Sequence, residues 1–203
     1  MTVLIFVSSP RRKAVAWAVA WGMGALLAWS GALVQAAATP TLVGSASEVL
    51  FTAKQIGVPL EGKFKRFDAQ IALDPRRPQT GSVAFGIELG SVSLNPESDA
   101  ELLKPEWFNA AKFPRATFTS TVIKPTGPGR FDVAGKLVIK GQSRDLVVPV
   151  ALTQAAGQTT ATGAFKLKRL DFRIGDGDWA DTSVVADEVQ VRFKLVLKDL
   201  PPL

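Results

Sequence analysis

The chain of 203 residues contains no cysteine, no histidine and no tyrosine. Because it has no cysteine, it forms no disulfide, and its stability must come from a hydrophobic core and from hydrogen bonds within sheets. Because it has no histidine, it lacks the usual general base and the usual transition-metal ligand. Carboxylates, lysine, serine and threonine remain for acid–base or nucleophilic roles. We therefore expect a protein that is not an enzyme and that needs neither a metal nor a cofactor.

The chain also lacks a concentration of positive charge, although its basic residues outnumber its acidic residues by 24 to 18. Three of the basic residues, Arg11, Arg12 and Lys13, lie in an N-terminal segment that we expect to be removed. The rest then carries 21 basic and 18 acidic residues, a net charge of +3, and the basic residues are spread singly. Nucleic-acid binding requires a basic patch or stripe. We therefore expect no nucleic-acid partner.

Residues 1–36 have the features of a secretory signal peptide. The basic cluster at 11–13 precedes 21 uncharged, mostly apolar residues, and small residues at 34–36, or next at 36–38, offer a cleavage site. An uncleaved membrane anchor is the alternative, because 21 uncharged residues nearly span a bilayer. We expect cleavage, export to the periplasm, and a single mature domain at 37–203.

Apolar and polar residues alternate with period two in most of the mature chain, which is typical of strands with one buried face. Between Phe64 and Phe67 the apolar spacing is three residues, which one β-bulge would repair. Gly141-Gln142 is expected to form a two-residue hairpin turn. The pattern predicts an all-β, eight-stranded antiparallel barrel, or a sandwich, with strands at 48–54, 62–73, 83–89, 116–124, 131–139, 146–152, 160–170 and 189–197.

A short helical segment interrupts the strands near residue 100. Ser98 and Glu101 form the S-x-x-E pattern of a capping box, which predicts that the helix begins at Ser98. Pro105 lacks the backbone donor that a helix needs and should end the segment within two turns. Trp107 and Phe108 follow directly and must pack against a hydrophobic surface.

The stretch that begins at Trp107 resembles a known family. WFNAAKFPRATFTS, followed by GRFDVAGKLVIKGQSRDLVVPV, is similar to the pattern of the YceI-like, polyisoprenoid-binding family. Many members carry histidine where this chain has Ala46, Gln55 and Lys140, so any contact made through those histidines is absent here. The resemblance covers residues 45–198, and its matching residues are Lys112, Phe113, Pro114, Ala116, Phe118, Ser120, Gly135, Leu137, Ile139, Gly141, Ser143, Arg144, Phe172, Ile174, Gly175, Gly177 and Trp179.

The resemblance implies an extended lipocalin-like barrel whose pore holds a long isoprenoid lipid. Composition alone does not decide between a barrel filled by its own side chains and one with a cavity. On the resemblance we expect a cavity, with Trp107 and Phe108 either gating one mouth or covering the open edge of the barrel. The expected lining residues are Phe51, Ile71, Phe85, Ile87, Phe118, Phe131, Val133, Val191 and Phe193.

The sequence therefore supports an exported protein that sequesters or transports an isoprenoid lipid, of the polyprenyl phosphate or quinone type. Such a carrier would be a monomer or a homodimer and would contact a membrane or a membrane protein transiently. A filled barrel that serves as an interaction module for a membrane protein is the first alternative, and its sign would be an exposed apolar patch. A lipid- or quinone-modifying enzyme is the second. Asp176, Asp178 and Asp181 lack the full ligand set of a calcium loop, so we expect a tight structural loop there.

Overall fold

A computed structural model of the protein describes residues 39–203. The expected signal peptide at 1–36 lies outside the described residues and stays a prediction, as does its cleavage. Within 39–203, none of the helices has the length and apolarity that crossing a membrane would require. The helical segments are short: α1 (Pro96–Leu102) and the 3-10 helices at Gly44–Ala46, Pro78–Thr80, Leu89–Ser91, Arg169–Phe172 and Gly177–Ala180.

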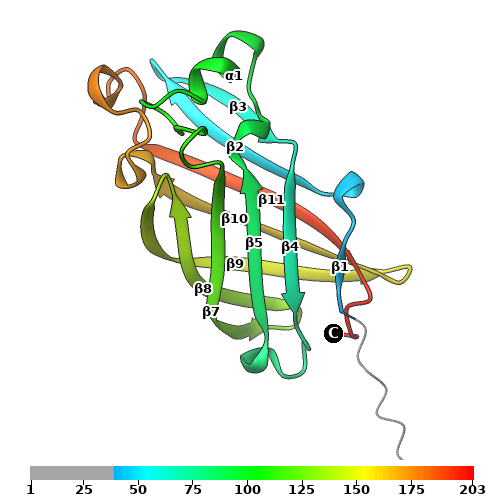
Figure 1. Cartoon of the computed structure of the whole chain (residues 1–203). Helices are drawn as coiled ribbons and strands as arrows, with labels where there is room; N and C mark the ends of the chain where they lie inside the picture. The colour runs from blue at the N-terminus through cyan, green and yellow to red at the C-terminus, as the bar shows by residue number, and fades with distance from the viewer. Residues whose placement is uncertain (1–38) are drawn as a thin grey trace, which may run out of the picture. The chain divides into compact units, whose positions relative to one another are not determined.

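The described residues form one antiparallel sheet of 11 strands, in the order β4-β5-β7-β8-β9-β10-β11-β2-β3-β6, with β1 added on β11. The sheet curls into a half-barrel and brings β1 alongside β4 (Figure 1). The predicted all-β antiparallel class with one short helix is confirmed. The strands are β1 (Thr41–Leu42), β2 (Glu48–Gln55), β3 (Val58–Phe64), β4 (Phe67–Ala72), β5 (Ser82–Glu88), β6 (Val92–Ser93), β7 (Arg115–Gly127), β8 (Arg130–Ile139), β9 (Gln142–Ala155), β10 (Gln158–Lys168) and β11 (Glu188–Lys198).

The strand count exceeds eight partly because the segment predicted as one bulged strand is two strands. Phe64 ends β3 and Phe67 begins β4, so the predicted bulge between them is wrong. The chain turns at Lys65 and Arg66, whose backbone N–H groups donate to the carbonyl and the hydroxyl oxygens of Ser91, at 3.1 and 3.0 Å. Because Ser91 satisfies both donors, the link leaves the sheet ladder without losing hydrogen bonds.

Three hairpins share one turn geometry, in which a residue with positive φ precedes a glycine with positive φ. The turns are Ile56-Gly57, Lys140-Gly141 and Ala156-Gly157, with φ near 49° at the first position and above 70° at the second. Positive φ at both positions defines the type I′ turn, which matches the twist of the flanking strands. The turn predicted at Gly141-Gln142 is therefore wrong by one residue, because Gly141 takes the second position and Gln142 already belongs to β9.

The N-cap of helix α1 lies three residues before the predicted N-cap. The side chain of Asn95 accepts a hydrogen bond from the backbone N–H of Ser98 at 2.8 Å, so Asn95 is the N-cap and the predicted capping box at Ser98 is wrong. Pro96 occupies the first helical position, where a missing N–H costs nothing. The helix ends at Leu102, as expected from the proline that follows.

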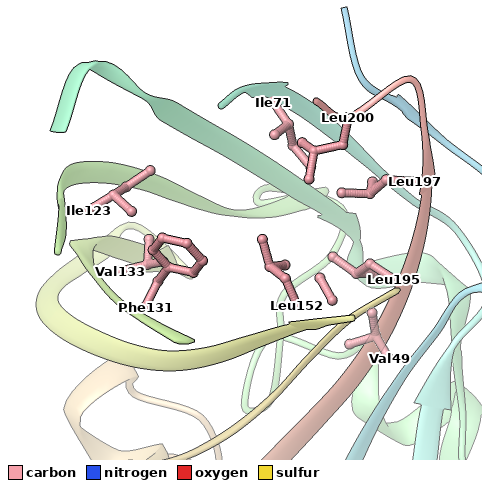
Figure 2. Packing of buried hydrophobic residues seen from close by; sticks show 10 residues of the cluster. Val49, Ile71, Ile123, Phe131, Val133, Leu152, Leu195, Leu197 and Leu200 are labelled. Carbon is pink, nitrogen blue, oxygen red and sulfur yellow. The ribbon is translucent and has the colours of Figure 1, made fainter. Parts of the chain in front are cut away.

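The buried apolar residues form two clusters. The cavity cluster, shown in Figure 2, consists of Val49, Ile71, Ile123, Phe131, Val133, Leu152, Ala161, Leu195, Leu197 and Leu200. The capping cluster consists of Leu89, Val92, Trp107, Phe108, Ala116, Leu137, Ile139, Phe172, Ile174 and Val185.

Candidate functional site

A cavity lies inside the curled sheet, within the cavity cluster. About 150 Å³ is open to the centre of a water molecule, whereas one water needs roughly 10–15 Å³ on the same measure. The barrel is therefore not filled by its own side chains. Thr117 is the one polar residue of the lining, which consists of Val49, Ile71, Leu73, Val83, Phe85, Ile87, Ala116, Thr117, Phe118, Ile123, Phe131, Val133, Leu137, Leu146, Val148, Val150, Leu152, Ala161, Phe165, Val191, Phe193, Leu195 and Leu197.

Strand alternation places these side chains on the inner face. In β8, alternate residues are buried: Phe131, Val133, Gly135 and Leu137. In β9, the residues at 146, 148, 150 and 152 line the cavity, while the intervening residues face outward. Figure 2 shows Ile123, Phe131, Val133 and Leu152 converging from neighbouring strands. The lining thus comes almost entirely from the walls of the barrel.

Eight of the eleven residues expected at the site line this cavity, and three do not. Those on the lining are Ile71, Phe85, Ile87, Phe118, Phe131, Val133, Val191 and Phe193. The other three, Phe51, Trp107 and Phe108, lie in or against the capping cluster instead. The Phe64 ring connects two of them, with its centroid 5.5 Å from that of Phe51 and 6.1 Å from that of Phe108. Whether any of the eleven contacts a ligand stays a prediction.

Three glycines let phenylalanine rings lie flat against the sheet. Gly163 lies directly opposite Phe193 in the register of β10 and β11, and a Cβ on Gly163 would overlap that ring. A Cβ on Gly135 would lie 2.6 Å from the Phe118 ring. Gly62 stands in the same relation to Phe51, whose ring packs against the capping cluster. Where these rings lie on glycine, the middle of the barrel stays open.

Several further residues line the cavity and could be found from their spacing. Val148, Val150 and Leu152 show the same period-two alternation as the expected lining residues. Ile123 is different, because a register shift between Ser120 and Val122 reverses the faces of β7. This shift turns Ile123 inward and leaves Val122 44% exposed. Nothing in the local sequence marks it.

The buried charges lie near the capping cluster, and none of the residues on the cavity lining is charged. Arg169 is 2% exposed, and its burial lowers the pKa of its guanidinium group. It donates hydrogen bonds to four backbone carbonyl oxygens, those of Ala186 (3.2 Å), Ile174 (2.8 Å), Gly175 (3.1 Å) and Val185 (2.7 Å). With four of its five N–H donors paired in this way, the buried cation fastens two loop segments together.

Lys140 has a comparable role at its hairpin turn. Its Nζ donates to the carbonyl oxygens of Glu106 (3.2 Å) and Arg173 (2.5 Å) and lies 3.3 Å from a carboxylate oxygen of Asp176. These contacts hold a non-glycine residue in the left-handed conformation that the turn needs. They also commit Asp176 to a structural ion pair.

The aspartates at 176, 178 and 181 do not form a calcium site. Asp181 accepts hydrogen bonds from the hydroxyl and the backbone N–H of Ser183, which lower the pKa of its carboxyl. Across residues 39–203, no three acidic side chains come together in a way that could hold a metal ion. The segment 170–189 is thus occupied by structural contacts.

The fold and the site define a class: an antiparallel half-barrel with an apolar internal cavity, which is an architecture of binding proteins. The YceI-like domain matches residues 41–197 of the chain. The protein therefore belongs to the YceI-like family, and the resemblance drawn from the sequence is confirmed.

Known proteins are similar to this chain over most of its length. A UPF0312 protein of Yersinia enterocolitica is 32% identical over 162 residues, which cover 75% of this chain and 83% of that protein. The crystal structure of BcnA from Burkholderia cenocepacia is 40% identical with a TM-score of 0.74, covering 76% of this chain and 98% of BcnA. A polyisoprenoid-binding domain from Saccharophagus degradans shares the fold, with a TM-score of 0.66 at 18% identity, covering 80% and 99% of the two chains.

Proposed function

We propose that the protein binds a long isoprenoid lipid, of the polyprenyl phosphate or quinone type, with part of its hydrocarbon chain inside the cavity. The observation that carries this proposal is the cavity wall, in which Thr117 is the one polar residue. The family and the polyisoprenoid-binding domain of Saccharophagus degradans support the choice of lipid class. The lipid is held by burial alone, and the protein performs no chemistry on it.

The energetics suit such a ligand. Removing one CH₂ group from water contributes about 0.8 kcal/mol, so a few isoprene units supply most of a micromolar affinity after the costs of association. An apolar wall gains this energy without distinguishing one isoprenoid chain from another. Length and shape of the chain, rather than hydrogen bonding, then decide which lipid is held.

The export that we expect from residues 1–36 would place this carrier in the periplasm. A polyisoprenoid is insoluble in water, so its passage between membranes requires a cavity that covers the chain. The protein would load and unload at a membrane or at a membrane protein, and both a monomer and a homodimer are compatible with this role.

The proposal is tested by native mass spectrometry and solvent extraction of the mature protein from the periplasm of its own host. We expect a co-purifying isoprenoid lipid that solvent releases. A mass without ligand, together with no uptake of added polyprenyl phosphate or quinone, would overturn the proposal.

A matched pair of variants assigns the cargo to the cavity. Ala161 is 6% exposed and lines the cavity, so Ala161→Phe should fill the space and abolish the bound mass. Ala151 lies on the neighbouring strand with its side chain outside the lining, so Ala151→Phe should leave the bound mass unchanged. Equal loss in both variants would place the ligand elsewhere.

A further inference from the structure

The wall of the barrel is split between β9 and β10. Their ladder begins beside the hairpin turn, at Gln158↔Ala155, and its last pair is Gly163↔Val150. Beyond that pair, residues 142–149 continue their ladder with β8, and residues 164–168 continue theirs with β11. Figure 1 shows β9 and β10 together at their hairpin and apart toward the opposite end. We call this unpaired stretch the seam.

Pro149 accounts for the position where the seam starts. The N–H of Leu152 donates to the carbonyl oxygen of Gly129 at 2.7 Å, on the side of β8, and backbone groups alternate in direction along a strand. Pro149 is three residues away, so its backbone faces β10. Its carbonyl oxygen would indeed lie 2.7 Å from a Cβ on Gly163. Proline has no N–H to donate, so the β9–β10 ladder loses a donor where it ends.

A second hollow, of about 390 Å³, lies at the seam, and it shares two lining residues with the cavity. Leu146 and Phe165 line both spaces, one from each strand of the seam. Both are half-buried apolar side chains that pack against the capping cluster through apolar contacts, without a charge or a hydrogen bond. The remaining residues of the outer hollow are Val147, Pro149, Ala164, Lys166 and Gln190.

The edge of the sheet along β4 differs from the seam, because other segments cover it. There β1 lies alongside β4, and Leu200 packs with Ile71 and Leu197 in the cavity cluster (Figure 2). At the seam, by contrast, an outer hollow directly adjoins the cavity wall, and Val147 is 55% exposed. The seam and the β4 edge thus differ in what covers them.

We propose that the apolar chain of the ligand enters and leaves the cavity sideways, through the seam, when the side chains of Leu146 and Phe165 rotate apart. This inference rests on the proposed function. Moving these side chains breaks no backbone hydrogen bond of the β9–β10 ladder, because that ladder has already ended at Gly163. A flexible chain therefore passes through the wall while the rest of the barrel stays closed.

A cross-link across the seam tests the route. The chain has no cysteine, so a Val147→Cys, Ala164→Cys double variant reacts at those two sites alone with a reducible bis-methanethiosulfonate reagent. Stopped-flow fluorescence of N-phenyl-1-naphthylamine, an apolar probe, gives the rate constants of association and dissociation. Closing the route raises the activation barrier for entry and exit but leaves the free energies of the bound and unbound states unchanged. Both rate constants should therefore fall by at least about tenfold, with Kd nearly constant. Reduction should restore both.

The matched control is Ala151→Cys with Thr162→Cys, two residues that lie opposite each other in the paired part of the same strands. Its cross-link should leave both rate constants as in the unmodified protein. Unchanged kinetics in the seam-linked protein, or equal slowing in the two cross-linked proteins, would overturn the lateral route while leaving the proposed function standing. Failure of the unmodified protein to bind the probe would overturn both proposals.

A single substitution provides an independent check. Ala164→Trp places a large ring in the outer hollow, whereas Thr162→Trp places the same ring two residues away on the paired part of the outer face. The first should slow both rate constants and the second should not. The opposite ranking, or no difference, would contradict the route.

Discussion

The capping cluster and the cavity cluster use the same kinds of apolar side chains but differ in where those side chains come from. In the capping cluster, seven of ten buried residues come from loops, 3-10 helices or the two-residue strand β6, and Phe172, Trp107 and Leu89 are among them. In the cavity cluster, every buried residue except Leu200 belongs to a strand of the wall. A barrel end that receives loop side chains becomes a packed core, whereas one built from wall residues alone keeps a space.

The largest effect should come from the buried cation that joins the loops of the capping cluster. Arg169→Met leaves four carbonyl oxygens without their donor, three of them in buried hydrogen bonds. Each buried acceptor left unsatisfied costs about 1–3 kcal/mol, so the free energy of unfolding should fall by at least about 3 kcal/mol. Urea denaturation measures this loss. The control is Arg144→Met, since that exposed guanidinium lies over the Phe172 ring and contributes about 1 kcal/mol at most.

Truncating a ring in each cluster compares their packing directly. Phe172 is 2% exposed in the capping cluster, so Phe172→Ala should lower the free energy of unfolding by about 3–5 kcal/mol. Phe85 faces the cavity and already lacks packing partners on one side, so Phe85→Ala should cost less than half as much. Equal losses in urea denaturation would mean that the cavity wall is as tightly packed as the capping cluster.

Adding one methyl group tests how the rings of the wall are accommodated. In Gly163→Ala, the new Cβ meets the Phe193 ring and the carbonyl oxygen of Pro149, so the free energy of unfolding should fall by about 1–3 kcal/mol. The displaced ring should also weaken binding of N-phenyl-1-naphthylamine. Gly127→Ala is the control, because its Cβ would meet nothing closer than 3.9 Å. A tolerated Gly163→Ala would show that the wall adjusts freely.

The smallest expected effect is that of pH on probe binding in the cavity. None of the lining residues titrates, so Kd for N-phenyl-1-naphthylamine should stay constant between about pH 5 and pH 9. A fluorescence titration at several pH values measures this. A clear dependence of Kd on pH would mean that a charged group near the capping cluster contacts the probe.

Much of the wall was predictable because strand alternation is a local property. Phe131, Val133, Val191 and Phe193 line the cavity as their spacing indicated. The pattern that makes one face of each strand apolar also decides which residues face the inside of a curled sheet. The fold class and most of the predicted lining follow from that rule.

The remaining features depend on contacts between distant segments. Ser91 turns the chain at Lys65 and Arg66, so two strands appear where spacing suggested one bulged strand. Trp107 and Phe108 pack into the capping cluster because loop residues far along the chain meet them there. Whether the barrel is filled or hollow depends on which loops reach its interior, and no single segment carries that information.

One pair in the capping cluster gives the protein a built-in spectroscopic reporter. The rings of Trp107 and Trp179 lie 5.3 Å apart, tilted by 50°, and they are the two tryptophans of residues 39–203. Since the chain has no tyrosine, the near-ultraviolet absorption and fluorescence of the described domain arise almost wholly from this pair. Its signal follows melting of the capping cluster and is separate from the phenylalanine-lined cavity.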